Sequence, residues 1–154
     1  MSDQDEAVDH RQLGITLFNS TWRLIEQDDR SRADDDRLAH MAHASRYHWG
    51  EVGAPANLAR GEWLCSRVYA LLGRAEPSRH HAERALAICV DNELVDWDLA
   101  FCHEALARAA AVADDLARAR VEIERALAVE IAEDEDRALL LGDLATVPGV
   151  DVFW

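Results

Sequence analysis

The residues with the clearest capacity for chemistry are histidines. His40 and His43 are three positions apart, so in a helix their imidazoles share one face and can chelate a single metal ion. His48 follows on the same segment, and His81 is a further candidate ligand. Imidazole nitrogens suit zinc, nickel and copper. One hypothesis is therefore a histidine-based sensor or metal-dependent enzyme that holds a divalent transition metal such as Zn through His40, His43, His48 and His81.

Other observations favour histidines that simply lie at the surface of helices. Their spacing is not the His-Glu-x-x-His pattern of metalloproteases. A tetrahedral site also requires further ligands at about 2 Å, and the sequence supplies no geometry for them. In this interpretation the protein needs no cofactor.

The sequence contains none of the common catalytic motifs. It has no Gly-x-Ser-x-Gly elbow, no phosphate-binding loop and no Gly-x-Gly-x-x-Gly turn. The three cysteines, Cys65, Cys89 and Cys102, form no Cys-x-x-Cys pair, which indicates free and mostly buried thiols. Cys102 adjoins His103, but adjacent side chains on a helix point about 100° apart. We therefore predict no catalytic residues and favour a binding protein over an enzyme.

Charge and hydropathy exclude several classes of protein. Of the 154 residues, 30 are Asp or Glu and 16 are Lys or Arg, which gives a net charge of −14. A protein that binds nucleic acid would present a basic face, so no nucleic acid is expected as a partner. No apolar run approaches about 18 residues and no signal peptide is visible, so we expect a cytoplasmic protein that enters no membrane.

Apolar residues recur at helical spacing along almost the whole chain. Leu13, Leu17 and Leu24 mark one face of the first helix. Pro55 and Gly73 mark helix boundaries. The pattern predicts an all-α fold with helices at about residues 10–28, 34–50, 56–72, 77–91, 96–113, 116–132 and 134–147.

These helices are expected to form a single domain at residues 10–147. The acidic segment 1–9 is expected to be disordered. Residues 148–154 form an apolar tail that can either fold back over the last helix or dock on a second subunit, so a homodimer is a further hypothesis.

A stretch of the sequence returns after 41 residues. Residues 83–88 read ERALAI, and residues 124–129 read ERALAV. A period of this size in a chain rich in Ala and Leu is typical of stacked helical hairpins. The same shift aligns Leu17, Leu58 and Leu99. The repeat predicts an α-α superhelix of about three tandem hairpins that share one core, with the last helix as a C-terminal cap.

The second of these hairpins, residues 59–92, resembles a tetratricopeptide repeat. Ser66 and Tyr69 lie at the small and aromatic positions of that family, Gly73 lies at its turn, and Ala85 lies at its alanine in the second helix. The third hairpin lacks the aromatic residue, and the period of 41 exceeds the usual length of about 34. The chain is also similar to small helical-repeat proteins of actinobacteria. The resemblance implies an architecture and is almost silent on function.

The resemblance also implies which residues face a ligand. In tetratricopeptide-like stacks, the first helix of each hairpin lines a concave groove. Transferring these positions to the present chain gives Asn19, Trp22, Glu26, Arg60, Trp63, Arg67, Phe101, Glu104 and Arg108. Tryptophan and arginine are frequent anchors of interfaces, and guanidinium groups bind carboxylate or phosphate at two points. The alternative is that Trp22 and Trp63 fill the core between hairpins.

The sequence thus predicts an adaptor or scaffold that binds a protein or peptide in its groove, where an acidic group of the partner would suit the arginines. The residues expected to carry this function are Trp22, Arg60, Trp63, Arg67, Phe101, Glu104 and Arg108. Two alternatives stay open. One is the histidine-based metal site, and the other is a regulatory protein that binds a small molecule in a pocket closed by the last helix.

Overall fold

The computed structural model describes residues 7–152, which form seven α-helices and no strand. The all-α prediction is therefore confirmed for this part of the chain, and the observed helices match the predicted ones to within about one turn. None of these helices combines the length and the apolarity needed to span a lipid bilayer. They are α1 (His10–Ile25), α2 (Arg32–Val52), α3 (Pro55–Leu71), α4 (Ala75–Asp91), α5 (Asp96–Val112), α6 (Leu116–Ala128) and α7 (Asp134–Leu144).

Local side-chain contacts explain where several helices begin. The Asp9 carboxylate accepts a hydrogen bond from the amide of Gln12 and caps α1. Ser31 and Asp34 form a reciprocal capping box at the start of α2. Pro55 occupies the first turn of α3, where its missing N–H costs nothing. Such local signals are why these boundaries follow from the sequence.

The second and third hairpins turn in the same way. Gly73 follows α3 with φ 73°, and Asp114 follows α5 with φ 60°, so both lie in the left-handed region. In each turn, the next residue donates its amide N–H to a carbonyl near the end of the preceding helix over 2.9 Å. Gly73 and Asp114 are 41 positions apart, so the turn geometry recurs with the sequence.

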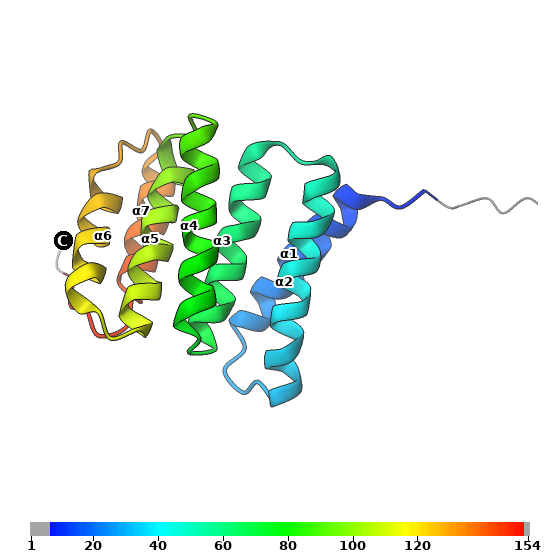
Figure 1. Ribbon diagram of the computed structural model, residues 1–154, viewed down its shortest axis with the longest axis horizontal. Coiled ribbons are helices and arrows are strands. Elements are labelled where there is room, and N and C mark those ends of the chain that lie inside the picture. Colours follow the sequence, from blue (N-terminus) through cyan, green and yellow to red (C-terminus); the bar gives the residue numbers. More distant parts are fainter. Residues whose placement is uncertain (1–6, 153–154) are drawn as a thin grey trace, which may run out of the picture.

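Helices that are neighbours in sequence are neighbours in space. α1 packs on α2, α3 on α4 and α5 on α6, and α2 and α4 each contact the helix that follows. A second set of contacts joins α1 to α3, α3 to α5 and α5 to α7. Figure 1 shows the resulting order, with α1 and α2 at one end and α6 at the other. The odd-numbered helices therefore form one continuous layer.

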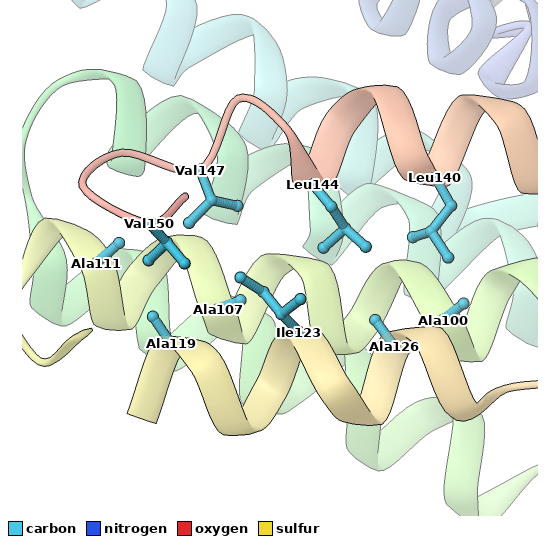
Figure 2. Packing of buried hydrophobic residues seen from close by; sticks show 10 residues of the cluster. All are labelled: Ala100, Ala107, Ala111, Ala119, Ile123, Ala126, Leu140, Leu144, Val147 and Val150. Carbon is cyan, nitrogen blue, oxygen red and sulfur yellow. The ribbon is translucent and has the colours of Figure 1, made fainter. Parts of the chain in front are cut away.

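A large hydrophobic cluster lies between α5, α6 and the C-terminal part of the chain. Alanines of α5 and α6 allow close helix contact there, and Figure 2 shows how side chains from α7 and the segment after it point into the cluster. These side chains are Leu140, Leu144, Val147 and Val150. α7 therefore packs on α5 and helps to bury its apolar face.

The two ends of the chain are described in part. Residues 1–6 of the predicted disordered segment lie outside the described residues, and residues 7–9 precede α1 without regular structure. In the apolar tail, Val150 is only 7% exposed because it packs on α5 and α6. Phe153 and Trp154 lie outside the described residues, and the homodimer stays a prediction.

The first hairpin closes around a glycine. A β-carbon on Gly14 would lie 2.9 Å from Nε1 of Trp49, so the absence of a side chain lets α1 approach this indole. The hydroxyl of Ser45 donates a hydrogen bond to the carbonyl oxygen of Gly14 over 2.8 Å. The packing of α1 on α2 therefore depends on Gly14.

Candidate functional site

Three hollows lie in a row on the layer of odd-numbered helices. The first, which we name the aromatic pocket, shares Phe18 and Trp63 with the middle hollow. The middle hollow shares Trp22 with the end hollow, which extends to Arg67 and Arg108. Because neighbouring hollows share lining residues, the three adjoin one another, and we refer to this row of hollows as the groove.

The aromatic pocket has a volume of about 350 Å³ and an almost wholly apolar lining. The rings of Trp63 and Phe101 meet edge to face, with centroids 5.9 Å apart, and Trp97 meets Phe101 in the same manner at 6.3 Å. α7 closes one side through Leu139. The full lining is Phe18, Ala59, Arg60, Trp63, Trp97, Asp98, Phe101, Cys102, Asp136 and Leu139. This volume and lining match sites that hold a small ligand.

Trp22 and Trp63 stack on each other between α1 and α3, with ring centroids 5.7 Å apart and 30° between planes. The guanidinium of Arg67 lies 5.6 Å from the ring centre of Trp22, within the range of a cation–π contact. Both indoles are half-buried and pack against a core cluster around Leu38 and Leu64. The two tryptophans therefore both line the groove and pack in the core.

Arg60 is held at the rim of the aromatic pocket. Its Nε and Nη2 donate to the two carboxylate oxygens of Asp98 over 2.9 and 3.1 Å. Its guanidinium also lies 4.3 Å from the ring centre of Trp97. This two-point pairing satisfies the charge of Arg60 within the protein.

Glu104 lies fully buried beneath the groove and is bound from three directions. Its Oε1 accepts hydrogen bonds from Arg67 over 3.2 Å and from Arg108 over 2.8 Å. Its Oε2 accepts the indole N–H of Trp63 over 3.0 Å. Arg108 in turn donates to the carbonyl oxygen of Asp143 over 2.9 Å. This ionic cluster joins α3, α5 and the end of α7.

The ionic cluster changes the role expected for its members. Burial and the nearby charge of Arg108 lower the pKa of Arg67, whereas burial and the charge of Glu104 raise the pKa of Asp143. Glu104 has no exposed surface, so it cannot touch a ligand in this conformation. The two arginines are paired inside the protein, which weakens the expectation that they bind an acidic group.

The structure brings most of the predicted groove residues together. Glu104 lies below the groove, and the others line it: Asn19, Trp22, Glu26, Arg60, Trp63, Arg67, Phe101 and Arg108. Their arrangement follows from the contacts between α1, α3 and α5.

The predicted metal ligands separate into different places. The rings of His43 and His81 lie with centroids 5.1 Å apart. His48 instead pairs with His10, with 2.9 Å between their Nδ1 atoms, and His40 is exposed. Within residues 7–152, no group of three or more His, Cys, Asp and Glu side chains is placed to hold a metal ion. The metal hypothesis therefore has no preformed site in the described part of the chain.

His43 and His81 belong to a polar network between α2, α3 and α4. His81 Nδ1 lies 2.7 Å from Oε2 of Glu62, and Arg46 donates to the other oxygen of this carboxylate over 3.1 Å. Burial opposes ionisation of Glu62, but the contacts with His81 and Arg46 outweigh it and lower its pKa. Burial and the neighbouring His81 lower the pKa of His43, whose Nε2 lies 2.9 Å from the hydroxyl of Tyr69.

The third hairpin contains the same pair with the partners exchanged. His103 Nδ1 on α5 lies 2.9 Å from Oε2 of Glu122 on α6. His103 stands 41 positions after Glu62, and Glu122 stands 41 positions after His81. Both pairs therefore bridge the two helices of a hairpin and are parts of the fold.

The cysteines are buried, as predicted. Cys65 contacts His43, and burial together with the charge of Glu62 raises the pKa of Cys65 to about 12. Such a thiol is a poor nucleophile near neutral pH. Cys89 and Cys102 lie next to each other on α4 and α5, with 3.5 Å between their sulfur atoms.

Sequence reasoning missed several residues of the aromatic pocket. One is Trp97, which stands four positions before the predicted Phe101 on the same helix, so the two form a recognisable aromatic pair. Phe18 gave a weaker signal because the 41-residue shift places it on Ala59. Leu139 lies on α7, outside the repeat, and only the packing of α7 on α5 brings it to the pocket.

Comparison with protein-family models, with curated proteins and with solved structures finds no match for this chain. The site therefore has to be judged by its own geometry. That geometry is a groove with one apolar pocket and an internally paired ionic cluster beneath it.

Proposed function

We propose that the protein is a recognition module that binds a peptide segment of a protein partner in the groove. The observation that carries this proposal is the row of three adjoining hollows, which share Phe18, Trp63 and Trp22 as lining residues. A groove of this kind suits an extended chain, and the aromatic pocket suits one large apolar side chain of that chain.

The proposal includes a tetratricopeptide-like superhelix of three hairpins closed by α7. Trp22 contacts Trp63, and Trp63 contacts Glu104, with 41 positions between the members of each pair. Equivalent positions of three successive first helices thus lie in a row. This row is the surface on which such stacks recognise a peptide.

The charges around the groove favour an uncharged apolar anchor in the aromatic pocket. Arg60 is paired with Asp98, and Asp136 adds a further carboxylate to the lining. In the end hollow, Arg67 is paired with Glu104 and keeps only 13% of its side chain exposed, so it leaves little charge for an acidic group of the partner. The partner we propose therefore has an apolar residue at one end of its bound segment.

Selection from a library of displayed random peptides tests this function. The full chain serves as bait, and each selected peptide is measured again on a Leu139→Arg variant. Leu139 is 66% exposed at the pocket, so arginine there blocks the pocket with little effect on folding. Val90→Arg is the matched control, because Val90 is 63% exposed on α4 and lines no part of the groove.

We expect peptides with a recurrent large apolar residue that lose at least about tenfold in affinity on Leu139→Arg, or about 1.4 kcal/mol. The same peptides should bind the Val90→Arg variant as they bind the original protein. Peptides that bind both variants equally, or a selection that yields no binder, would contradict the proposal.

A small molecule is the second candidate for the aromatic pocket. The specific observation in its favour is that α7 lines the pocket through Leu139 and Asp136, as expected for a regulatory protein that binds a ligand beside its last helix. Ligand-observed NMR with a library of aromatic fragments tests this candidate on the same two variants. Binding that Leu139→Arg abolishes and Val90→Arg preserves, in the absence of any selected peptide, would favour it.

A further inference from the structure

Two cysteines meet directly behind the aromatic pocket. Sγ of Cys89 on α4 lies 3.5 Å from Sγ of Cys102 on α5, and both thiols are free. Cys89 is 0% exposed and Cys102 is 2% exposed, and both pack in a cluster with Ala59 and Ala85. Cys102 also lines the aromatic pocket. Cys102 is thus the member of the pair that borders the pocket, and Cys89 is enclosed behind it.

We propose that Cys89 and Cys102 form a redox-active dithiol that peroxides convert to a disulfide between α4 and α5. The two sulfur atoms must approach by roughly 1.5 Å to reach the bonding distance of about 2.05 Å. α4 is the second helix of one hairpin and α5 is the first helix of the next. The bond would therefore fasten two successive hairpins together next to the groove.

The oxidation balances with hydrogen peroxide as the oxidant. One sulfur attacks a peroxide oxygen, so an S–O bond forms, the O–O bond breaks, and the departing hydroxide takes the proton of that thiol to give water. The other sulfur attacks the resulting sulfenic acid, so an S–S bond forms and the S–O bond breaks. The second hydroxide takes the proton of the second thiol. Two thiols lose two electrons and two protons, and the peroxide becomes two molecules of water.

The contact between the sulfur atoms distinguishes this pair from the third cysteine. The contact with Cys102 lowers the pKa of Cys89, while the contact with Cys89 and burial raise the pKa of Cys102, so the pair loses its first proton more easily than its second. Cys65 has a raised pKa and contacts an imidazole in place of a thiol. Cys65 therefore serves as an internal control for selective oxidation.

Thiol mapping of the folded full chain tests the proposal. The protein is treated with hydrogen peroxide, unfolded in the presence of an alkylating agent, digested and analysed by mass spectrometry. We expect a peptide pair joined through Cys89 and Cys102, with the loss of two hydrogen atoms, and an alkylated Cys65. Dithiothreitol should reverse the product, and Cys65→Ser should leave it unchanged.

Two results would overturn the proposal. One is that all three thiols of the folded chain stay free in peroxide that oxidises them in the unfolded chain. The other is that Cys65 enters disulfides as often as Cys89 and Cys102 do. Because the readout requires no groove ligand, it stands apart from the peptide selection, and either result can hold without the other.

Discussion

Nε1 of Trp63 donates a hydrogen bond to Oε2 of Glu104 over 3.0 Å, and the two residues stand 41 positions apart in the sequence. At the preceding position of this series, Trp22 stacks on Trp63. Trp22, Trp63 and Glu104 thus stand at equivalent positions, 41 residues apart, and the third of them is a carboxylate in place of an indole. This exchange explains why Arg67 and Arg108 converge there, because a buried carboxylate needs cationic donors.

Replacement of Glu104 by alanine should destabilise the protein by about 3–5 kcal/mol, because two largely buried guanidinium groups would lose their shared carboxylate. Urea unfolding followed by circular dichroism measures the change. Glu26→Ala is the control, since Glu26 is exposed in the end hollow and should leave the midpoint nearly unchanged. Equal midpoints for the two variants would show that the ionic cluster contributes little.

The sequence predicted the helices and several of the residues that line the groove, but it did not predict this cluster. Helix boundaries depend on contacts between near neighbours, such as Ser31 with Asp34, and these are visible in sequence. The groove positions were inferred from the resemblance to tetratricopeptide repeats. Whether Glu104 faces a ligand or the interior depends on where α7 packs, because Arg108 also binds the end of α7. No local pattern records that long-range contact.

The contacts of the histidines were also not predicted from the sequence, because they depend on neighbouring helices. The spacing of His40 and His43 predicted a shared face, yet His43 meets His81 while His40 stays exposed. The decisive partner of His81 is Glu62, a carboxylate on a different helix. Comparison of the second and third hairpins would have revealed it, because the pair recurs with His103 in place of Glu62.

Gly14→Ala should destabilise the first hairpin by about 1–3 kcal/mol, because the new methyl group would overlap the indole of Trp49. Thermal unfolding detects the loss. Gly142→Ala is the matched control, since a β-carbon at Gly142 on α7 meets no atom within 4 Å and alanine favours a helix. The interpretation fails if Gly14→Ala melts at or above the temperature of the original protein.

Swapping the two residues of the Glu62–His81 contact should show that their contributions to the free energy of unfolding are coupled. Glu62→His or His81→Glu alone should each cost about 1–3 kcal/mol, because each leaves like groups facing one another. The double variant recreates the order that His103 and Glu122 already have in the third hairpin. We expect it to recover at least about 0.5 kcal/mol beyond the sum of the single effects. A double-mutant cycle by urea unfolding measures this coupling, and strict additivity would rule it out.

Mild acid should destabilise the protein through His43. Burial and His81 lower the pKa of His43 from its usual value of 6.5, so as the pH falls the unfolded chain takes up this proton before the folded chain does. Stability should therefore decrease between about pH 7 and about pH 5.5. Glu62 does not change the stability in this pH range, because its pKa is lowered and the stability that it contributes is lost only below its usual pKa of 4.5. The pKa of Asp143 is raised, so the folded chain takes up this proton before the unfolded chain does, and Asp143 favours the folded state as the pH falls.

The His43→Gln variant isolates this effect from the other titrating groups. Glutamine keeps a polar side chain beside Tyr69 but has no proton to gain in this range. Urea unfolding of both proteins at the two pH values gives the comparison. The variant should lose less stability on acidification than the original protein, because only the original protein carries the imidazole of His43. An equal loss in the two proteins would mean that His43 is not the group that responds to acid.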